Sequence, residues 1–167
     1  LDQIKISVSY SQTNVKIVGS HGGSMTGQDG PTGQSVMDIA IARSIPHLNV
    51  VVPADYYETV AATRALYETV GPCFMRTCRE KTDVLYDSVP NFKFGKADLL
   101  REGKDAAIIA CGALVPEAMK AAEILKKQNL SVSVLNCASI KPLDAKAVAK
   151  ECAKGVVVSA EDGVVNG

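Results

Sequence analysis

Three polar side chains, His21, Asp29 and Arg79, have types and positions in the chain that suit acid–base and phosphate chemistry. An imidazole titrates near neutral pH, so it can transfer a proton or hydrogen bond to a polarised oxygen. The planar guanidinium of an arginine binds a phosphate group with two hydrogen bonds. Asp29 lies between Gly27 and Gly30, and glycines let the backbone approach a ligand closely.

Each of these three residues also has an ordinary structural role when it is considered alone. Histidines and arginines at strand ends are often satisfied by local hydrogen bonds or by water, and an aspartate before a glycine is a common turn residue. However, His21 follows the strand-like run at 15–20, and Arg79 follows the run at 73–78. Ligands bind beyond the carboxyl ends of the strands in open parallel sheets, so we expect the three side chains to share one edge.

A glycine-rich stretch carries two of the three residues. We call residues 20–34, SHGGSMTGQDGPTGQ, the glycine loop; it contains five glycines and no large aliphatic residue apart from Met25. Such a stretch is either slack chain or a loop that is held in one shape for a purpose. Because His21 and Asp29 both lie on it, we favour the second interpretation.

The first half of the chain alternates short apolar strands with helices. The predicted strands lie at 15–20, 49–53 and 73–78, and the predicted helix between the first two lies at 35–45. Asp55 and Glu58 have capping-box spacing, which predicts a second helix that runs to about Val70. Residues 2–12 alternate like a strand, but their polar opening favours the tail of a helix. This rhythm predicts a parallel sheet.

The alternation restarts after an irregular stretch. Charged residues, Pro90 and the short run FKFGKADLL fill residues 81–103, where we predict a linker with an edge strand. Beyond it, the predicted strands lie at 105–112, 130–136 and 155–161, and the predicted helices at 115–129 and 141–152. We therefore expect an α/β fold with two parallel-sheet units.

These two units correspond to two incomplete domains. We place them at residues 1–80 and 104–167, on either side of the linker at 81–103. The chain starts within a helix-like run and stops after a strand that no helix follows. We therefore expect the native protein to extend beyond both ends.

The composition excludes several kinds of partner and site. Lys and Arg equal Asp and Glu at 18 each and are scattered, so we expect neither nucleic acid nor a membrane surface as a partner. The five cysteines contain no Cys-x-x-Cys pair, which argues against a disulfide framework or a zinc site and favours the cytoplasm. Cys111 and Cys137 lie in apolar runs and are expected to be core residues.

The order of residues from 20 to 59 resembles the transketolase family. The family pattern is approximately T-H-x-x-x-x-x-G-E-D-G-P-T-H-Q, an acidic helix rich in Ile and Ala, R-x-I-P-N-M, a strand, and P-x-D-x-x-E. The chain keeps this spacing in SHGGSMTGQDGPTGQSVMDIAIARSIPHLNVVVPADYYET. The matching positions are His21, Gly27, Asp29, Gly30, Pro31, Thr32, Gln34, Arg43, Ile45, Pro46, Pro53, Asp55 and Glu58. The runs REGKDAAIIACGALVPEAM and NCASIKPLD are similar to the family's carboxyl-terminal domain, in particular to the separate carboxyl-terminal subunit of split transketolases.

The resemblance implies a partial pyrimidine-binding domain followed by a partial carboxyl-terminal domain of a thiamine diphosphate enzyme. Such an enzyme moves a two-carbon ketol unit from a ketose phosphate to an aldose phosphate in pentose phosphate metabolism. By this resemblance, His21 contacts the reacting substrate oxygens, Asp29 binds a substrate hydroxyl, and Arg79, seven residues after Pro72, binds the phosphate tail.

The same resemblance implies that the chain acts only in a larger assembly. Thiamine diphosphate and Mg²⁺ would be bound mainly by residues upstream of Leu1 and by an amino-terminal diphosphate-binding subunit or domain. The chain itself is expected to hold no metal ion, to join a homo- or hetero-oligomer and to be inactive when isolated.

Three positions depart from the family pattern. Gly33 stands where the family has a second loop histidine, Gln28 stands where it has a glutamate, and Met37 stands where an acidic residue is frequent. If that histidine acts as an oxyanion-type donor, its absence costs roughly 3 kcal/mol of transition-state stabilisation.

Other interpretations follow from these departures and from the shared architecture. One is a non-catalytic structural or regulatory relative. Another is a relative of deoxyxylulose phosphate synthase or of the 2-oxoacid dehydrogenase beta subunit, against which the runs GQDGPT and IKPLD favour transketolase.

Overall fold

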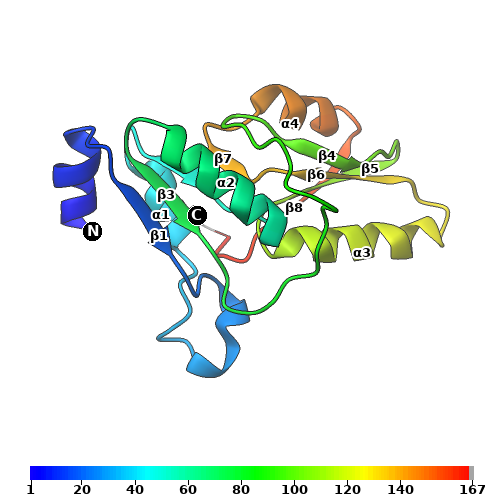
Figure 1. The fold of residues 1–167 in the computed structure, drawn as a ribbon. Coiled ribbons are helices and arrows are strands. Elements are labelled where there is room, and N and C mark those ends of the chain that lie inside the picture. Colours follow the sequence, from blue (N-terminus) through cyan, green and yellow to red (C-terminus); the bar gives the residue numbers. More distant parts are fainter. Residues whose placement is uncertain (166–167) are drawn as a thin grey trace.

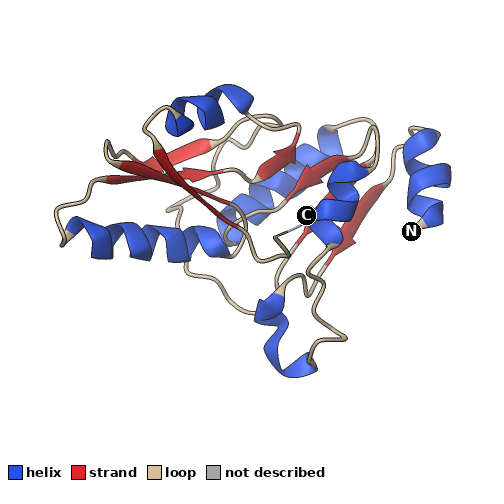
Figure 2. Cartoon of the chain, turned by 180° about the vertical axis from the view of Figure 1, so that it is seen from behind, coloured by secondary structure: helices blue, strands red, loops and turns tan. Residues whose placement is uncertain are grey.

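The computed structural model describes residues 1–165, which form two four-stranded sheets with helices packed on them (Figures 1 and 2). The strand orders are β1-β3-β2-β7 and β4-β6-β5-β8. The α/β class with two sheets is therefore confirmed. Within the described residues, every helix is too short or too polar to cross a bilayer.

The first sheet contains the three parallel strands that the sequence predicts. They are β1 (Lys16–Gly19), β2 (Asn49–Val51) and β3 (Cys73–Arg76), joined by α1 (Asp38–Ser44) and α2 (Tyr56–Glu68). The helix α1 begins at Asp38 rather than at residue 35. A short π-helix, Ile4–Tyr10, precedes β1, so the helical interpretation of residues 2–12 is confirmed.

The fourth strand of this sheet comes from the second half of the chain and was not predicted. This strand, β7 (Ser139–Lys141), pairs antiparallel with β2. Three residues are too few to show a strand period, so no sequence pattern marks it. The helix predicted from residue 141 consequently starts later, as α4 (Ala145–Cys152), where Asp144 accepts a hydrogen bond of 3.1 Å from the Ala147 amide.

The second sheet is parallel except at one edge. The strands β6 (Val132–Asn136), β5 (Ala106–Ala110) and β8 (Val156–Ala160) are parallel, and β4 (Asp98–Arg101) pairs antiparallel with β6. The strand β4 lies in the stretch that was expected to hold an edge strand. Figure 1 shows α3 (Leu114–Lys126) and α4 on opposite faces of this sheet.

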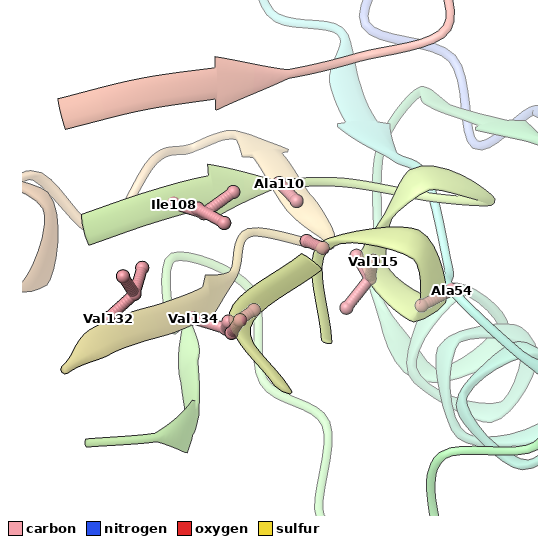
Figure 3. Close-up of a cluster of buried hydrophobic side chains, with 8 residues drawn as sticks. Ala54, Ile108, Ala110, Val115, Val132 and Val134 are labelled. Atoms are coloured by element: carbon pink, nitrogen blue, oxygen red, sulfur yellow. The ribbon is translucent and has the colours of Figure 1, made fainter. Parts of the chain in front are cut away.

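The two sheets share a core at their junction. Ala54, from the turn between β2 and α2, packs beside Val115 at the start of α3 and belongs to the core cluster of the second sheet (Figure 3). The Val52 carbonyl accepts a hydrogen bond of 3.1 Å from Gly112, and the Val52 amide donates one of 2.8 Å to Ala138. The two halves of the chain are therefore joined by main-chain bonds as well as by apolar contact.

The predicted cap of α2 also ties the linker to the first sheet. The Asp55 carboxylate accepts hydrogen bonds from the amides of Glu58 at 2.8 Å, of Leu85 at 2.8 Å and of Tyr86 at 3.0 Å. The Glu58 carboxylate reaches back to the Ala54 amide at 2.7 Å, one residue before the cap. Asp55 thus holds both the first turn of α2 and the linker segment that contains Leu85 and Tyr86.

Cys111 and Cys137 are core residues, as predicted. Their side chains are buried, and neither is in a disulfide. Burial raises the pKa of Cys111 to about 12 and that of Cys137 to about 11, so both stay as neutral thiols near neutral pH.

Candidate functional site

The glycine loop extends beyond the carboxyl end of β1 and turns back to α1. Figure 1 shows it below the first sheet, with the 3-10 helix Ser24–Asp29 at its tip. The loop is pinned at its base, where the Gly22 amide donates to Thr77 at 3.1 Å and the Gly23 amide donates to Ser35 at 2.7 Å. It is therefore a shaped loop rather than slack chain.

His21 lies exposed at the start of this loop. Its φ is +62°, a left-handed conformation that costs an L-residue roughly 1 kcal/mol. The ring Nδ1 is 2.9 Å from the Ser20 hydroxyl, and the His21 carbonyl accepts a hydrogen bond of 2.8 Å from the Thr26 hydroxyl. Strained residues of this kind are concentrated at functional sites because the surrounding structure must hold them in place.

Asp29 and Arg79 form an ion pair across the loop. The distance from Arg79 Nη1 to Asp29 Oδ1 is 2.8 Å, and the side chains are 27% and 41% exposed. Arg79 Nη1 also donates to the Thr26 carbonyl at 3.2 Å. Within the part of the chain that the structure describes, Arg79 Nη2 and Nε make no hydrogen bond, so these donors are free for an anion.

Thr26 connects the three predicted residues. It is fully buried, donates to the His21 carbonyl and accepts from Arg79, which in turn holds Asp29. No hydrogen bond joins His21 directly to the other two within residues 1–165. No sequence pattern indicates this role, since a threonine among glycines is usually a turn residue.

A buried ion network, also unpredicted, lies under the loop. Arg76, at the end of β3, is 4% exposed; its Nη1 is 3.3 Å from Asp38 Oδ1, and its Nη2 donates to the Asp162 carbonyl at 2.7 Å. Arg76 Nη2 also lies 3.8 Å from Asp162 Oδ2. Charges this well buried are stable only when paired, so these three residues act as one unit.

Asp162 extends this network to the loop. Its Oδ1 accepts from the Ser24 amide at 2.8 Å and the Ser24 hydroxyl at 2.7 Å, and its Oδ2 accepts from the Met25 amide at 3.3 Å. Burial alone would raise the pKa of Asp162, but these hydrogen bonds and the Arg76 charge outweigh it and hold the pKa below its ordinary value. Asp162 is therefore the charged partner of the loop.

The loop glycines fall into two groups. A Cβ on Gly22 would lie 2.1 Å from Arg76 Nε, and one on Gly23 would lie 2.0 Å from Asp162 Oδ2. These two glycines are required for packing over the buried ion network. In contrast, a Cβ on Gly27 or Gly30, the glycines that flank Asp29, would meet nothing within 4 Å.

Position 33 lies against Asp29. A Cβ on Gly33 would stand 3.0 Å from the Asp29 Cβ, so a larger side chain there would press on the base of the Asp29 side chain. A pocket of about 420 Å³ opens beside this end of the loop, lined in part by Gly33, Met37 and Phe74. His21, Asp29 and Arg79 do not line this pocket, and they lie on an open surface of the chain.

The described residues provide no metal site. Residues 1–165 contain no group of three or more His, Cys, Asp or Glu side chains that could hold a metal ion. The chemistry that the loop offers is therefore that of one imidazole, one carboxylate and one guanidinium with free donors.

Comparison with known proteins gives two family matches that together cover most of the chain. The model described as "Transketolase, pyrimidine binding domain" matches residues 1–83, and the one described as "Transketolase, C-terminal domain" matches residues 95–167. A "Putative transketolase C-terminal section" of Methanocaldococcus jannaschii is 40% identical over 166 residues, which cover 98% of this chain and 52% of that protein. Human transketolase is 35% identical over 170 residues, which cover 99% of this chain and 27% of that protein.

Solved structures agree with these matches. A structure titled "Split gene transketolase, inactive beta4 tetramer" has a TM-score of 0.89 and 31% identity, over 98% of this chain and 53% of that one. The transketolase of Leishmania mexicana has a TM-score of 0.85 and 30% identity, over 100% of this chain and 26% of that one. The chain thus spans about half of the separate carboxyl-terminal sections and about a quarter of the full-length enzymes.

Proposed function

The chain belongs to the transketolase family, and on that basis we propose that it forms the substrate-facing part of an enzyme that transfers a two-carbon ketol unit between sugar phosphates. The observation that carries the proposal is the Asp29–Arg79 pair on the glycine loop, with free guanidinium donors on an open surface. A surface site of this kind needs a second surface to exclude water. We assign that surface to an amino-terminal diphosphate-binding subunit or domain.

Each site residue has a proposed task that follows from its chemistry. Arg79 binds the phosphate tail of the sugar through the donors that Asp29 leaves free. Asp29 accepts a hydrogen bond from a substrate hydroxyl. The space beside the nearby glycines Gly27 and Gly30 is open, which leaves room for the substrate. His21 hydrogen bonds to the reacting oxygens, with its left-handed backbone holding the ring at the strand end.

We assign the cofactor to the proposed partner. Residues 1–165 contain no group of three or more His, Cys, Asp or Glu side chains that would hold a metal ion by themselves. Thiamine diphosphate supplies carbanion stabilisation when it is bound. The tasks of this chain are to bind, orient and hydrogen bond the sugar phosphate.

One further observation supports an assembly with a partner. The similar split-gene structure is titled as an inactive β4 tetramer, which fits a chain that oligomerises but needs another subunit for activity. We also propose a cytoplasmic location, which the five free cysteines support, and a role in pentose phosphate metabolism, which rests on the family alone.

Gly33 favours a second candidate, a non-catalytic structural or regulatory relative. The family histidine is absent at a position whose Cβ would contact Asp29, so a direct neighbour of the site has lost its functional group. This candidate predicts no ketol transfer and no cofactor binding in any assembly.

The two candidates are separated by reconstitution. The chain is mixed with an amino-terminal transketolase section, thiamine diphosphate and Mg²⁺, and ketol transfer from a ketose phosphate to an aldose phosphate is measured. We expect activity from the mixture and none from the chain alone. Arg79→Ala should raise KM for the sugar phosphate at least about tenfold, because a charge-assisted phosphate bond is worth roughly 1.5–3 kcal/mol.

Matched variants complete this experiment. Arg64→Ala removes an exposed arginine from α2 and should leave KM unchanged. Gly33→His should raise the turnover of an active assembly, since it restores a donor beside Asp29. An inactive wild-type mixture in which Gly33→His restores neither activity nor cofactor binding would favour the non-catalytic candidate.

A further inference from the structure

Asp162 lies far from the glycine loop in sequence but contacts it in space. It follows β8, the last strand along the chain, and Figure 1 shows the chain after β8 returning toward the first sheet. Its contact with Ser24 joins residues 138 positions apart. The second half of the chain therefore reaches the loop that carries His21 and Asp29.

The contact is a helix cap supplied from another part of the fold. The first amides of a helix have no partner within the helix. The Asp162 carboxylate provides that partner for Ser24 at 2.8 Å and Met25 at 3.3 Å, at the start of the 3-10 helix Ser24–Asp29. The N-cap position itself is Gly23, which has no side chain to do this.

The carboxylate is itself held in place. Arg76 donates to the Asp162 carbonyl, and its charge lies near the carboxylate on the buried side. The Val164 amide donates to Val36 at 3.0 Å, just past the far end of the loop. Asp162 is thus fixed by β3 on one side and by the segment before α1 on the other.

The capped helix carries the site. Thr26, in the turn that Asp162 caps, bonds to the His21 carbonyl and to Arg79. Asp29 ends the next turn, beyond a break in the helical backbone at Gly27, and is held by its ion pair with Arg79. A shift of Ser24 and Met25 would therefore move Thr26 and, through it, all three proposed site residues.

We propose that Asp162 is a positioning residue that holds the glycine loop in the conformation that binds sugar phosphate. This inference rests on the proposed function, because it assigns a role in that reaction. It gives the second half of the chain a direct part in substrate binding.

The test combines amide exchange in the chain with kinetics of the reconstituted complex. Asp162→Ala should speed hydrogen exchange at the Ser24 and Met25 amides and raise KM for the sugar phosphate about tenfold, with a smaller effect on kcat. Asp162→Asn keeps one carboxamide oxygen for the Ser24 amide and should give intermediate values of both. Thermal unfolding of each variant shows whether the fold is intact.

Asp87→Asn is the control. Asp87 is an exposed aspartate outside the Arg76 network and makes none of the bonds to the loop, so loop exchange and KM should stay near wild type. The proposal is overturned if a folded Asp162→Ala variant keeps wild-type loop exchange, or if its loop exchanges faster while KM is unchanged. An inactive wild-type complex would instead contradict the proposed function, and the exchange data would still decide whether Asp162 holds the loop.

Discussion

Glu58 is a carboxylic acid buried where α2 meets the second sheet, with 2% of its surface exposed. Its Oε1 accepts a hydrogen bond of 2.8 Å from Asn136 Nδ2, and Tyr86 Oη lies 3.5 Å from the same oxygen. Burial raises the pKa of Glu58 from 4.5 to about 7, and the nearby charges of Asp98 and Asp55 add to the effect of burial. The folded protein therefore binds this proton more tightly than the unfolded chain does.

This difference predicts a pH dependence of stability. Between pH 4.5 and about 7 the unfolded chain loses the Glu58 proton while the folded protein keeps it, so the free energy of unfolding falls as pH rises through this window and levels off above it. The loss is roughly 3 kcal/mol for a shift of this size. Urea unfolding from pH 4 to 8 measures it, and Glu58→Gln should flatten the decline.

The exposed residue Asp87 provides the control for this series. Asp87→Asn should leave the decline between pH 4.5 and about 7 as it is in the wild type. A wild-type decline that persists unchanged in Glu58→Gln would show that another group is responsible.

The proposed site could be predicted only in part at the residue scale. His21 and Arg79 were selected because each follows a strand, and Asp29 because it lies among the glycines of the loop; the structure joins Asp29 to Arg79 in an ion pair. Thr26 and Asp162 were missed, since their roles depend on contacts that the chain makes only after folding. For Asp162, the partner lies 138 residues away.

At the scale of elements, periodic segments were predictable and contact-dependent ones were not. The strands β1, β2 and β3 appear where short apolar runs predict them. The strand β7 has only three residues and forms by pairing with the edge of β2. This pairing leaves no periodic pattern in the sequence of β7. The 3-10 helix in the glycine loop likewise depends on a cap from outside the loop.

The close packing of the glycine loop on β3 gives a prediction at this scale. A Cβ at position 22 would lie 2.1 Å from Arg76 Nε and 2.6 Å from its Cδ, and the ion pairs of Arg76 prevent it from moving away. Gly22→Ala should therefore lower the free energy of unfolding by roughly 2 kcal/mol, as overpacking does, in urea unfolding at neutral pH.

Gly19, in β1, is the matched position for this comparison. A Cβ there would lie 3.4 Å from the Phe74 ring, an ordinary contact, so Gly19→Ala should change stability by less than about 0.5 kcal/mol. Equal stabilities of the two variants would mean that the loop is free to lift away from Arg76.

At the scale of the whole molecule, the two sheets are joined too closely to behave as separate bodies. Ala54 packs in the core of the second sheet, β7 from the second half completes the first sheet, and the chain after β8 caps the loop of the first. Contacts of this number and kind favour a single cooperative transition. We therefore expect the two segments that the family models match to unfold together.

The junction at Gly112 tests this cooperativity. Its φ is +58°, and a Cβ there would lie 2.7 Å from Val52 Cγ1, across the boundary between the two halves. Gly112→Ala should lower stability by roughly 2 kcal/mol or more through backbone strain and overpacking together. Gly155→Ala is the control: its φ is +98° and nothing lies within 4 Å of the new Cβ, so it has the backbone strain without the junction contact and should lower stability less.

Thermal unfolding followed by circular dichroism, with hydrogen exchange of both sheets, should show one transition that Gly112→Ala moves as a whole. Two separate transitions, with only one moved by the substitution, would show that the halves unfold independently despite their shared core.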